Sequence, residues 1–368
     1  MKTYLVGGAV RDQLLDIPFN EKDWVVTGAN REAMLAAGFQ PVKGDFPVFL
    51  HPDTGDEYAL ARRETKVGPG YHGFSVDVGM DVTLEEDLAR RDLTINAMAL
   101  DHNGNLIDPY HGQEDLNEGL LRHVSSAFIE DPVRLLRIAR FAAKLGRWGF
   151  RVAHGTQGLI KKMAKSDDLM NLRKERVWKE MRTALQEQQP WRFFEVLHKC
   201  GALQRLLPEL SASLGTLGSH TGITPSGPLD ALRRAAADNA GLEIRYAVLM
   251  LNNQQTGLPV DKACADLLSL ARRLRDDYLQ LGTASANQLL TFVERGGKGG
   301  QERLRALLAV YAYAWPEHVE LALRRVSMAQ QAAESVIARE MMREGFQGVA
   351  LGKALRERKL QKIQQALG

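Results

Sequence analysis

Cysteines and long apolar runs are scarce in this chain. Cys200 and Cys264 are the only cysteines among its 368 residues, and they stand far apart without metal-ligand spacing. The sequence therefore supports neither a disulfide framework nor a zinc site, and reduced thiols are expected. Every apolar run is far shorter than a membrane helix requires, and the first residues reach Gly7 and Gly8 without a cleavable signal pattern. We expect a cytoplasmic protein with no membrane contact.

Charge is also nearly balanced. Lys and Arg number 48 against 45 Asp and Glu, and a net charge of +3 is too mild to indicate a polyanionic partner by itself. The basic residues nevertheless gather in two clusters, a distribution typical of nucleic-acid binding, although solvated helix faces explain the terminal cluster equally well. The clusters are Arg134, Arg137, Arg140, Lys144, Arg147, Arg151, Lys161, Lys162, Lys165, Arg173, Lys174, Arg176, Lys179 and Arg182, and then Lys353, Arg356, Arg358, Lys359 and Lys362.

The residue pattern changes near residue 125 and predicts an α+β fold. Before it, β-rich runs at 3–8, 22–28, 46–52 and 57–63 accompany helical stretches at Arg11–Leu15 and Asn30–Ala37. After it, apolar residues recur almost throughout at three- and four-residue spacing, which indicates helices. We therefore expect an α/β head followed by helical domains. Residues 215–228 have the composition of a linker, and 296–300, GGKGG, that of a hinge.

The first motif is YLVGGAVRDQLLDIPFNEKDWVV, residues 4–26. Gly7 and Gly8, between a strand and a helix, let backbone N–H groups approach a phosphate, and Arg11 adds a guanidinium, although a tight turn alone also explains them. Glu21 and Asp23 stand at i and i+2, so an extended chain directs both carboxylates to one side. Two carboxylates beside a triphosphate are what two-metal phosphoryl transfer requires. A solvated edge strand is the alternative.

The second motif is RRDLTINAMALD, residues 90–101. Arg91 is suited to neutralising phosphate charge, and Asp92 to accepting a hydrogen bond from a ribose hydroxyl, which would separate NTP from dNTP. Alternatively, Asp92 caps a helix that residues 93–100 are expected to begin.

The third motif, EDPVRLLRIARFAAKLG at 130–146, pairs Asp131 with Arg134. Cytosine and adenine both present an amino donor beside a ring-nitrogen acceptor, so a carboxylate and a guanidinium side by side select these two bases. Asp131 also has the position of a helix N-cap, with Pro132 as the first helical residue. Arg134, Arg137 and Arg140 recur every third residue beside the apolar stripe Leu135, Leu136, Ile138, Ala139 and Ala142.

These motifs, together with DPYHGQEDL at 108–116, LRHV at 121–124 and ERVWKE at 175–180, resemble the bacterial tRNA nucleotidyltransferases, the CCA-adding enzymes of the second class. They occur in the expected order over about 180 residues, and the match is looser from Leu206 onward, where GFQG at 345–348 resembles the family's C-terminal segment. The resemblance implies a polymerase β-like nucleotidyltransferase head at 1–124 and a base-selecting neck at 125–190. It also implies a helical body at 191–300 and a helical, tRNA-binding tail at 301–368.

The implied activity is addition of C, C and A to the 3′ end of tRNA without a nucleic-acid template, from CTP and ATP, with Mg²⁺ as cofactor and no protein partner. Glu21 and Asp23 would be the catalytic metal ligands, and Glu130 would orient Arg134. The remaining residues would bind the nucleotide, Asp92 at the ribose and Asp131 with Arg134 at the base: Gly8, Arg11, Arg91, Asp92, Asp131, Arg134, Arg137 and Arg140.

The sequence departs from the family pattern at two places. The family's metal pair is Asp, any residue, Asp, whereas Glu21 stands first here, and a shift of its carboxylate by about a bond length can cost roughly a hundredfold in rate. Glu57 is the alternative ligand. Relatives from gamma-proteobacteria also carry a phosphohydrolase domain marked by adjacent His and Asp, where this chain has Asn252 and Asn253. Because amides replace metal ligands poorly, we predict no phosphohydrolase activity.

Two other functions remain open at this stage. A narrower specificity would be poly(A) synthesis, or CC-only or A-only addition. The Gly- and Pro-containing segment Glu64–Glu86 is similar to the flexible loop that A addition needs in this family, which argues against CC-only addition. A catalytically weak tRNA-binding paralogue is favoured only by Glu21.

Overall fold

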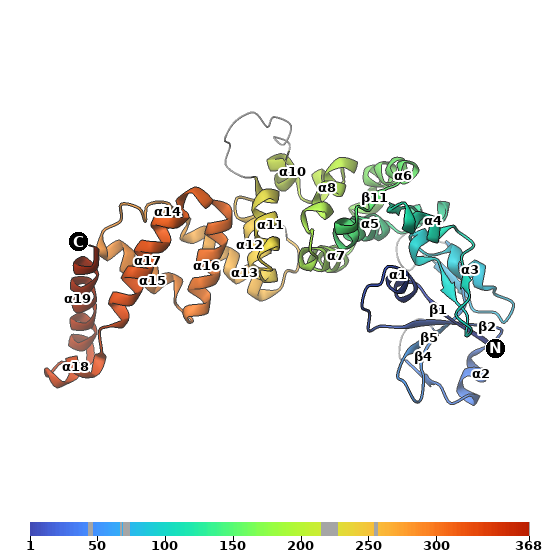
Figure 1. Cartoon of the computed structure of the whole chain (residues 1–368), viewed down its shortest axis with the longest axis horizontal. Helices are drawn as coiled ribbons and strands as arrows, with labels where there is room; N and C mark the ends of the chain where they lie inside the picture. Colours follow the sequence, from blue (N-terminus) through green and yellow to red (C-terminus); the bar gives the residue numbers. More distant parts are fainter. Residues whose placement is uncertain (43–46, 67, 69–73, 215–226, 254–256, 368) are drawn as a thin grey trace. The chain divides into compact units, whose positions relative to one another are not determined.

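The computed structural model describes residues 1–42, 47–66, 68, 74–214, 227–253 and 257–367. By internal contacts the chain forms two compact units, and each is described by itself. The first comprises Met1–Ala184 and Arg192–Leu206, and the second comprises Leu185–Trp191 and Leu207–Gly368. The first unit contains the sheet and the second is helical, as the α+β prediction requires (Figure 1).

A mixed sheet organises the first unit, in the order β3-β4-β5-β2-β1-β8-β9. Strand β1 (Lys2–Val6) is antiparallel to the central strand β2 (Asp23–Thr27) and to β8 (Ala99–Leu100), whereas β2 is parallel to β5 (Glu57–Leu60). Strands β1, β2, β4 and β5 confirm the four strand runs predicted from sequence. The outer strands are β3 (Gln40–Pro41), β4 (Val48–Leu50) and β9 (Leu106–Ile107).

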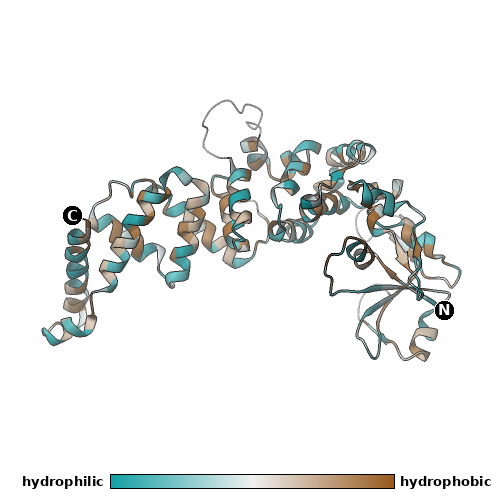
Figure 2. Ribbon diagram, in the orientation of Figure 1, coloured by the Kyte–Doolittle hydropathy of each residue, from teal (hydrophilic) through white to brown (hydrophobic). Residues whose placement is uncertain are grey.

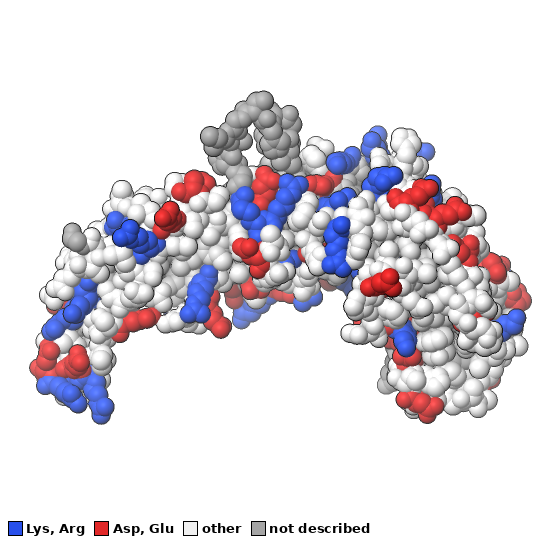
Figure 3. Space-filling model, viewed as in Figure 1, with Lys and Arg blue, Asp and Glu red and all other residues white. Residues whose placement is uncertain are grey.

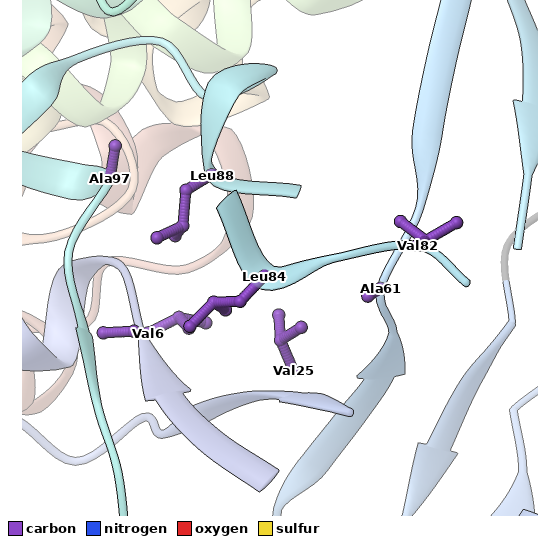
Figure 4. Packing of buried hydrophobic residues seen from close by; sticks show 8 residues of the cluster. Val6, Val25, Ala61, Val82, Leu84, Leu88 and Ala97 are labelled. Atoms are coloured by element: carbon purple, nitrogen blue, oxygen red, sulfur yellow. The ribbon is translucent and has the colours of Figure 1, made fainter. Parts of the chain in front are cut away.

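Alternating side chains of β1 build the core on both faces of the sheet. Val6 packs with Val25 and with Leu84 and Leu88 of helix α3 (Leu84–Ala89), as Figure 4 shows. The preceding residue, Leu5, belongs to a different cluster that includes Ala9 and Val10 of helix α1 (Gly8–Leu14). Because neighbouring strand residues point to opposite faces, α1 and α3 cover opposite sides of the sheet. The turn between β1 and α1 lies at the end of this interior strand, where the chain passes onto one face of the sheet.

Within 125–190, the segment predicted to be a helical neck, the first α-helix is α5 (Val133–Leu145), whose buried face contains the predicted apolar stripe. The domain boundaries themselves stay a prediction. Other helices of the first unit are α2 (Arg31–Ala36), α4 (Gly112–Asn117), α6 (His154–Lys165), α7 (Lys174–Gln186), α8 (Trp191–Cys200) and α9 (Ala202–Leu206). Two small sheets pair β6 (Arg63–Lys66) with β7 (Phe74–Asp77) and β10 (Leu120–Leu121) with β11 (Arg151–Val152).

The second unit is built from helices that carry hydrophobic and hydrophilic residues side by side (Figure 2). An aromatic stack of Tyr278, Tyr311 and Trp315 joins α14 to α16 and to the residue that follows it. The helices are α10 (Pro208–Leu214), α11 (Pro228–Ala237), α12 (Leu242–Met250), α13 (Lys262–Arg273), α14 (Arg275–Leu279), α15 (Ala286–Gly296), α16 (Gln301–Ala314), α17 (Val319–Glu334), α18 (Ala338–Arg343) and α19 (Gly348–Leu367).

Charged residues of both signs are interspersed on the face drawn in Figure 3, as expected from the nearly balanced composition. Among the described residues, no helix is both long and apolar enough to cross a membrane.

One element of secondary structure differs from its prediction. Residues 93–100 were expected to begin a helix, but only a 3-10 turn forms at Thr94–Asn96, and the chain continues as β8. The helix prediction is wrong because Ala99 and Leu100 pair with β1, and sheet pairing outweighs the local preference.

Three predicted loops have different outcomes. Most of the predicted linker, 215–226, lies outside the described residues, and Pro228 already begins α11. The GGKGG stretch separates α15 from α16, as a break should, while its role as a hinge stays a prediction. Within Glu64–Glu86, residues 67 and 69–73 lie outside the described residues, and described parts contribute to β6, β7 and α3.

Candidate functional site

A cavity of about 560 Å³ in the first unit brings together residues from all three motifs. Every predicted site residue lines it except Glu130, which lines a neighbouring cavity of about 840 Å³. Asp131, Val133, Arg137 and Arg176 line both cavities. The residues of the first cavity are Gly7, Gly8, Arg11, Glu21, Asp23, Arg90, Arg91, Asp92, Asn96, Asp131, Val133, Arg134, Arg137, Arg140, Phe141, Lys144 and Arg176.

The glycine turn leaves room for an arginine at the cavity wall. Gly7 has φ +73°, a left-handed conformation that favours glycine, and a Cβ there would lie 2.8 Å from Nη1 of Arg91. Arg91 Nη2 donates to Asp87 over 3.3 Å, and Arg90 donates to the other carboxylate oxygen of that fully buried residue. The Nε of Arg91 is buried and has no hydrogen-bond partner among the described residues. This guanidinium is therefore held beside the turn with donor capacity remaining.

A chain of polar side chains connects α1, the 3-10 turn and α5. Arg11 Nη1 donates to Asn96 Oδ1 over 2.5 Å, and Asn96 Nδ2 donates to Asp92 Oδ1 over 3.1 Å. Arg137 Nε completes the chain with a bond of 2.7 Å to Asp92 Oδ2. Burial by itself would raise the pKa of Asp92, but Arg137 and the hydrogen bonds from Asn96 and the Leu93 N–H outweigh it and lower the pKa to about 2. Asp92 is therefore an ionised acceptor.

Asp12 fixes Arg11 from the other side. Its Oδ1 accepts from Arg11 Nε over 2.8 Å, and its Oδ2 accepts from Lys144 Nζ over 3.0 Å. Burial lowers the pKa of Arg11, Asp12 opposes this shift, and the nearby charge of Arg140 adds to it. The opening motif is thus tied to α5 by an ion pair that sequence reasoning did not predict.

The acidic pair lies at the entrance of β2. Asp23 is the first residue of that strand, Glu21 precedes it by two, and both side chains are exposed on the cavity. Neighbouring protein atoms desolvate Asp23 enough to raise its pKa, an effect that Arg91 opposes and Glu21 reinforces. Among the described residues, no cluster of three or more His, Cys, Asp and Glu forms a metal site. Two carboxylates lining a cavity that is also lined by arginines suit Mg²⁺, which takes its remaining ligands from substrate phosphates and water.

Asp131 and Arg134, the pair predicted to select the base, are each held by neighbouring groups. Helix α5 begins at Val133, one residue later than predicted, with Pro132 at the N-cap, yet Asp131 Oδ1 still accepts from the Val133 N–H over 3.1 Å. Arg134 donates to the carbonyl oxygens of Ala127 and Arg90 over 2.8 and 2.6 Å. The predicted action of Glu130 on Arg134 stays a prediction.

Arg176 of α7 was not predicted as part of this site. Its Nη2 donates to Asp131 Oδ2 over 2.8 Å and its Nη1 to Oδ1 over 3.3 Å, so a fork binds the carboxylate. Four residues further along α7, Glu180 accepts from Arg140 Nε over 2.6 Å. This spacing places Arg176 and Glu180 on one face of the helix, and it was the signal available in ERVWKE.

Sequence reasoning also missed an aromatic ring in the cavity wall. Phe141 is 4% exposed, and the guanidinium carbons of three arginines surround its ring. They lie at 5.2 Å for Arg11, 5.9 Å for Arg137 and 4.5 Å for Arg140 from the ring centroid. The position of an aromatic residue four after Arg137 and directly after Arg140 was its only sequence signal.

Two family models match parts of this chain. Residues 3–122 match the family model of the poly A polymerase head domain, and residues 149–214 match a model described as a probable RNA and SrmB-binding site of polymerase A. The chain is 44% identical to a CCA-adding enzyme from Pseudomonas entomophila over 386 residues, covering 99% of each chain. It is 56% identical to a multifunctional CCA protein from Laribacter hongkongensis over 256 residues, covering 68% of this chain and 62% of that protein.

Solved structures agree in fold. A CCA-adding enzyme in its apo form II superposes with a TM-score of 0.72 at 24% identity, covering 99% of this chain and 88% of that one. The arrangement of a mixed-sheet head followed by helices is therefore shared with that enzyme.

Proposed function

Because this chain belongs to the CCA-adding enzyme family, we propose that the 560 Å³ cavity of its first unit is where nucleotides are added to tRNA. The protein is a tRNA nucleotidyltransferase that adds C, C and A to the 3′ end of tRNA from CTP and ATP without a nucleic-acid template. Its relatives do not favour poly(A) synthesis, a partial CC or A addition, or a tRNA-binding paralogue without turnover. A cytoplasmic location is part of the proposal, because tRNA, CTP and ATP are used there.

The observation that carries the proposal is the convergence of three kinds of group on one cavity. Two exposed carboxylates suited to metal line it, guanidinium groups line it as well, and Asp131 and Arg134 contribute a carboxylate and a guanidinium near the start of α5. In the reaction, the 3′-hydroxyl oxygen of tRNA attacks the α-phosphorus of the nucleotide, and the bond to the β-phosphate breaks with release of diphosphate. Each group serves one part of that chemistry.

Glu21 and Asp23 would hold divalent cations, Mg²⁺ in this proposal, together with phosphate oxygens of the nucleotide. Such cations supply activation of the attacking hydroxyl and neutralisation of the leaving diphosphate. Both side chains line the cavity and are exposed, so cations held by them would be accessible to the RNA end.

Arg11, Arg91, Arg137 and Arg140 would bind the triphosphate. Desolvated guanidinium groups bind phosphate strongly because their N–H donors match its oxygens and the cavity wall excludes water. Asp92 would accept a hydrogen bond from the ribose, since the contacts with Arg137 and Asn96 keep it ionised and fixed. Ribonucleotides would thereby be preferred over deoxyribonucleotides.

Asp131 and Arg134 would select the base. The carboxylate accepts from the exocyclic amino group of cytosine or adenine, and the guanidinium donates to the adjacent ring nitrogen. Guanine and uracil present the opposite pattern, and each buried polar group left unpaired costs about 1 to 3 kcal/mol. Arg176 donates to both carboxylate oxygens of Asp131. It would thereby fix the orientation of the carboxylate, and with it the direction of the lone pairs that remain to accept from the base.

The test uses tRNA transcripts that end before CCA, after the first C and after CC. Each is incubated with purified protein, Mg²⁺ and CTP, ATP or both, and products are resolved at single-nucleotide length. We expect CTP to complete CC on the first two transcripts, ATP to add one A to the third, and both to give CCA. Extended A tracts would indicate poly(A) synthesis, arrest after CC would indicate partial addition, and binding without extension would indicate an inactive paralogue.

A further inference from the structure

Three positive charges meet at one aromatic ring beside the nucleotide cavity. The guanidinium carbons of Arg11, Arg137 and Arg140 all lie within 5.9 Å of the Phe141 ring centroid. Arg11 comes from α1, whereas the other two precede Phe141 on α5. Phe141 is 4% exposed, so little water reaches the ring to screen its electrostatic attraction for the guanidinium groups.

Each of the three arginines has a carboxylate partner of its own, and the partners lie apart in the sequence. They are Asp12 for Arg11, Asp92 for Arg137 and Glu180 for Arg140. These separate pairs balance charge but give the three guanidinium groups no common contact. Phe141 is a contact that all three share, and the negative faces of an aromatic ring attract cations.

We propose that Phe141 is a positioning residue that gathers Arg11, Arg137 and Arg140 around the triphosphate of the incoming nucleotide. The inference rests on the proposed function, because it assigns these arginines to phosphate. Since the ring acts on phosphate-binding groups, it affects CTP and ATP alike and leaves the choice between them unchanged. If the ring only fills space, its removal would affect folding, but a change in the electron density of its π face would not change the affinity for nucleotides.

Fluorination separates these two roles. Successive fluorine atoms on a phenyl ring withdraw electron density and weaken attraction for cations, while shape and apolar area change little. We would place mono-, di- and trifluorophenylalanine at position 141 of the full chain. The dissociation constants of CTP and ATP would be measured by calorimetry with Mg²⁺ and without tRNA. Thermal unfolding would be measured on the same samples.

We expect both dissociation constants to rise stepwise with each fluorine, reaching about tenfold in the trifluoro protein, which corresponds to ~1.4 kcal/mol. The ratio between the CTP and ATP constants stays level. The same series at Phe193, buried on α8 against Phe194, is the matched control and leaves both constants unchanged. Phe141→Leu, which removes the ring, raises both constants at least as far.

Constants that stay flat across the series in folded protein would overturn the role of Phe141. This result is distinct from failure of the proposed function, which would appear as wild-type protein that binds CTP and ATP but does not extend tRNA. Wild-type protein that binds neither nucleotide would overturn both.

Discussion

Arg137 donates from Nε to Oδ2 of Asp92 over 2.7 Å, and this ion pair joins helix α5 to the turn that precedes β8. Asp92 is buried and its pKa is lowered to about 2, because Arg137 and two N–H donors outweigh the effect of burial. Because the pKa of Asp92 is lower in the folded state than its ordinary value of 3.8, the ionised Asp92 stabilises the fold fully above about pH 4. It is lost as pH falls toward the folded-state pKa of about 2.

Asp92→Asn is therefore expected to lower the free energy of unfolding by roughly 2 kcal/mol near pH 7, with a gap that shrinks as pH falls below about 4. Urea unfolding of both proteins at a series of pH values measures the gap. Asp101→Asn, at an exposed turn of the same head, is the control, and its smaller effect sets the background. A gap that widens in acid would contradict the lowered pKa of Asp92.

Arg176 is expected to affect which base is added as well as how fast. Its fork binds both oxygens of Asp131, and Lys cannot reproduce that planar geometry. Arg176→Lys should therefore lower discrimination against GTP and UTP by about tenfold, a change of ~1.4 kcal/mol. The measurement is kcat/KM for all four nucleotides on a tRNA ending after the first C. Lys179→Ala, one turn along α7, should change all four rates by a common factor.

The base-reading pair itself gives a stronger test. Exchanging hydrogen-bonding character in the double variant Asp131→Asn with Arg134→Glu should relax or invert the preference for C and A, because donor and acceptor positions are exchanged. Incorporation of each nucleotide is read at single-nucleotide resolution, and each single variant serves as a control. An active double variant that still adds only C and A would show that other groups read the base.

Most residues of the candidate site could be predicted from short sequence motifs. Among the residues that were not predicted, Phe141 and Arg176 depend on tertiary packing. Asp92 and Asp131 stand in short motifs whose chemistry is visible without a fold. Phe141 and Arg176 acquire a role only because α1 and α7 pack beside α5, and no local spacing fixes that packing. Residues 93–100 show the same effect in secondary structure, since pairing with β1 overrides a helical pattern.

The second departure from the family pattern concerns Asn252 and Asn253, which follow α12. Asn253 is buried and its side-chain N–H donates to the Leu249 carbonyl, while Arg272 donates to the carbonyl oxygens of Met250 and Asn253. A guanidinium beside this stretch disfavours a divalent cation. We therefore expect 2′,3′-cyclic phosphate and phosphodiester substrates to stay intact with Ni²⁺ or Mn²⁺. Robust hydrolysis that depends on the metal would show that a phosphohydrolase site lies elsewhere.

Substitutions of Asp23 and Glu21 test whether both carboxylates are metal ligands. Asp23→Ala should abolish nucleotide addition and leave tRNA binding largely intact, because the tRNA is expected to contact mainly the basic neck and tail. Glu21→Ala should also abolish turnover, since one carboxylate does not fix two divalent ions against a triphosphate. Rates of single-nucleotide addition and filter binding of labelled tRNA measure the two effects separately.

Glu21→Asp is the informative substitution at this pair. The shorter side chain moves the carboxylate by about one bond length, and a displacement of that size can change a rate roughly a hundredfold. Because Glu21 precedes β2 and is exposed on the cavity, the site has room for a shorter side chain to take its place, and we expect Asp to keep or raise the rate. A lower rate would show that the site has adjusted to Glu. Near-full activity of Glu21→Ala would instead transfer the ligand role to another acid. Glu57 is then the first candidate, since it pairs in register with Asp23 on the neighbouring strand β5.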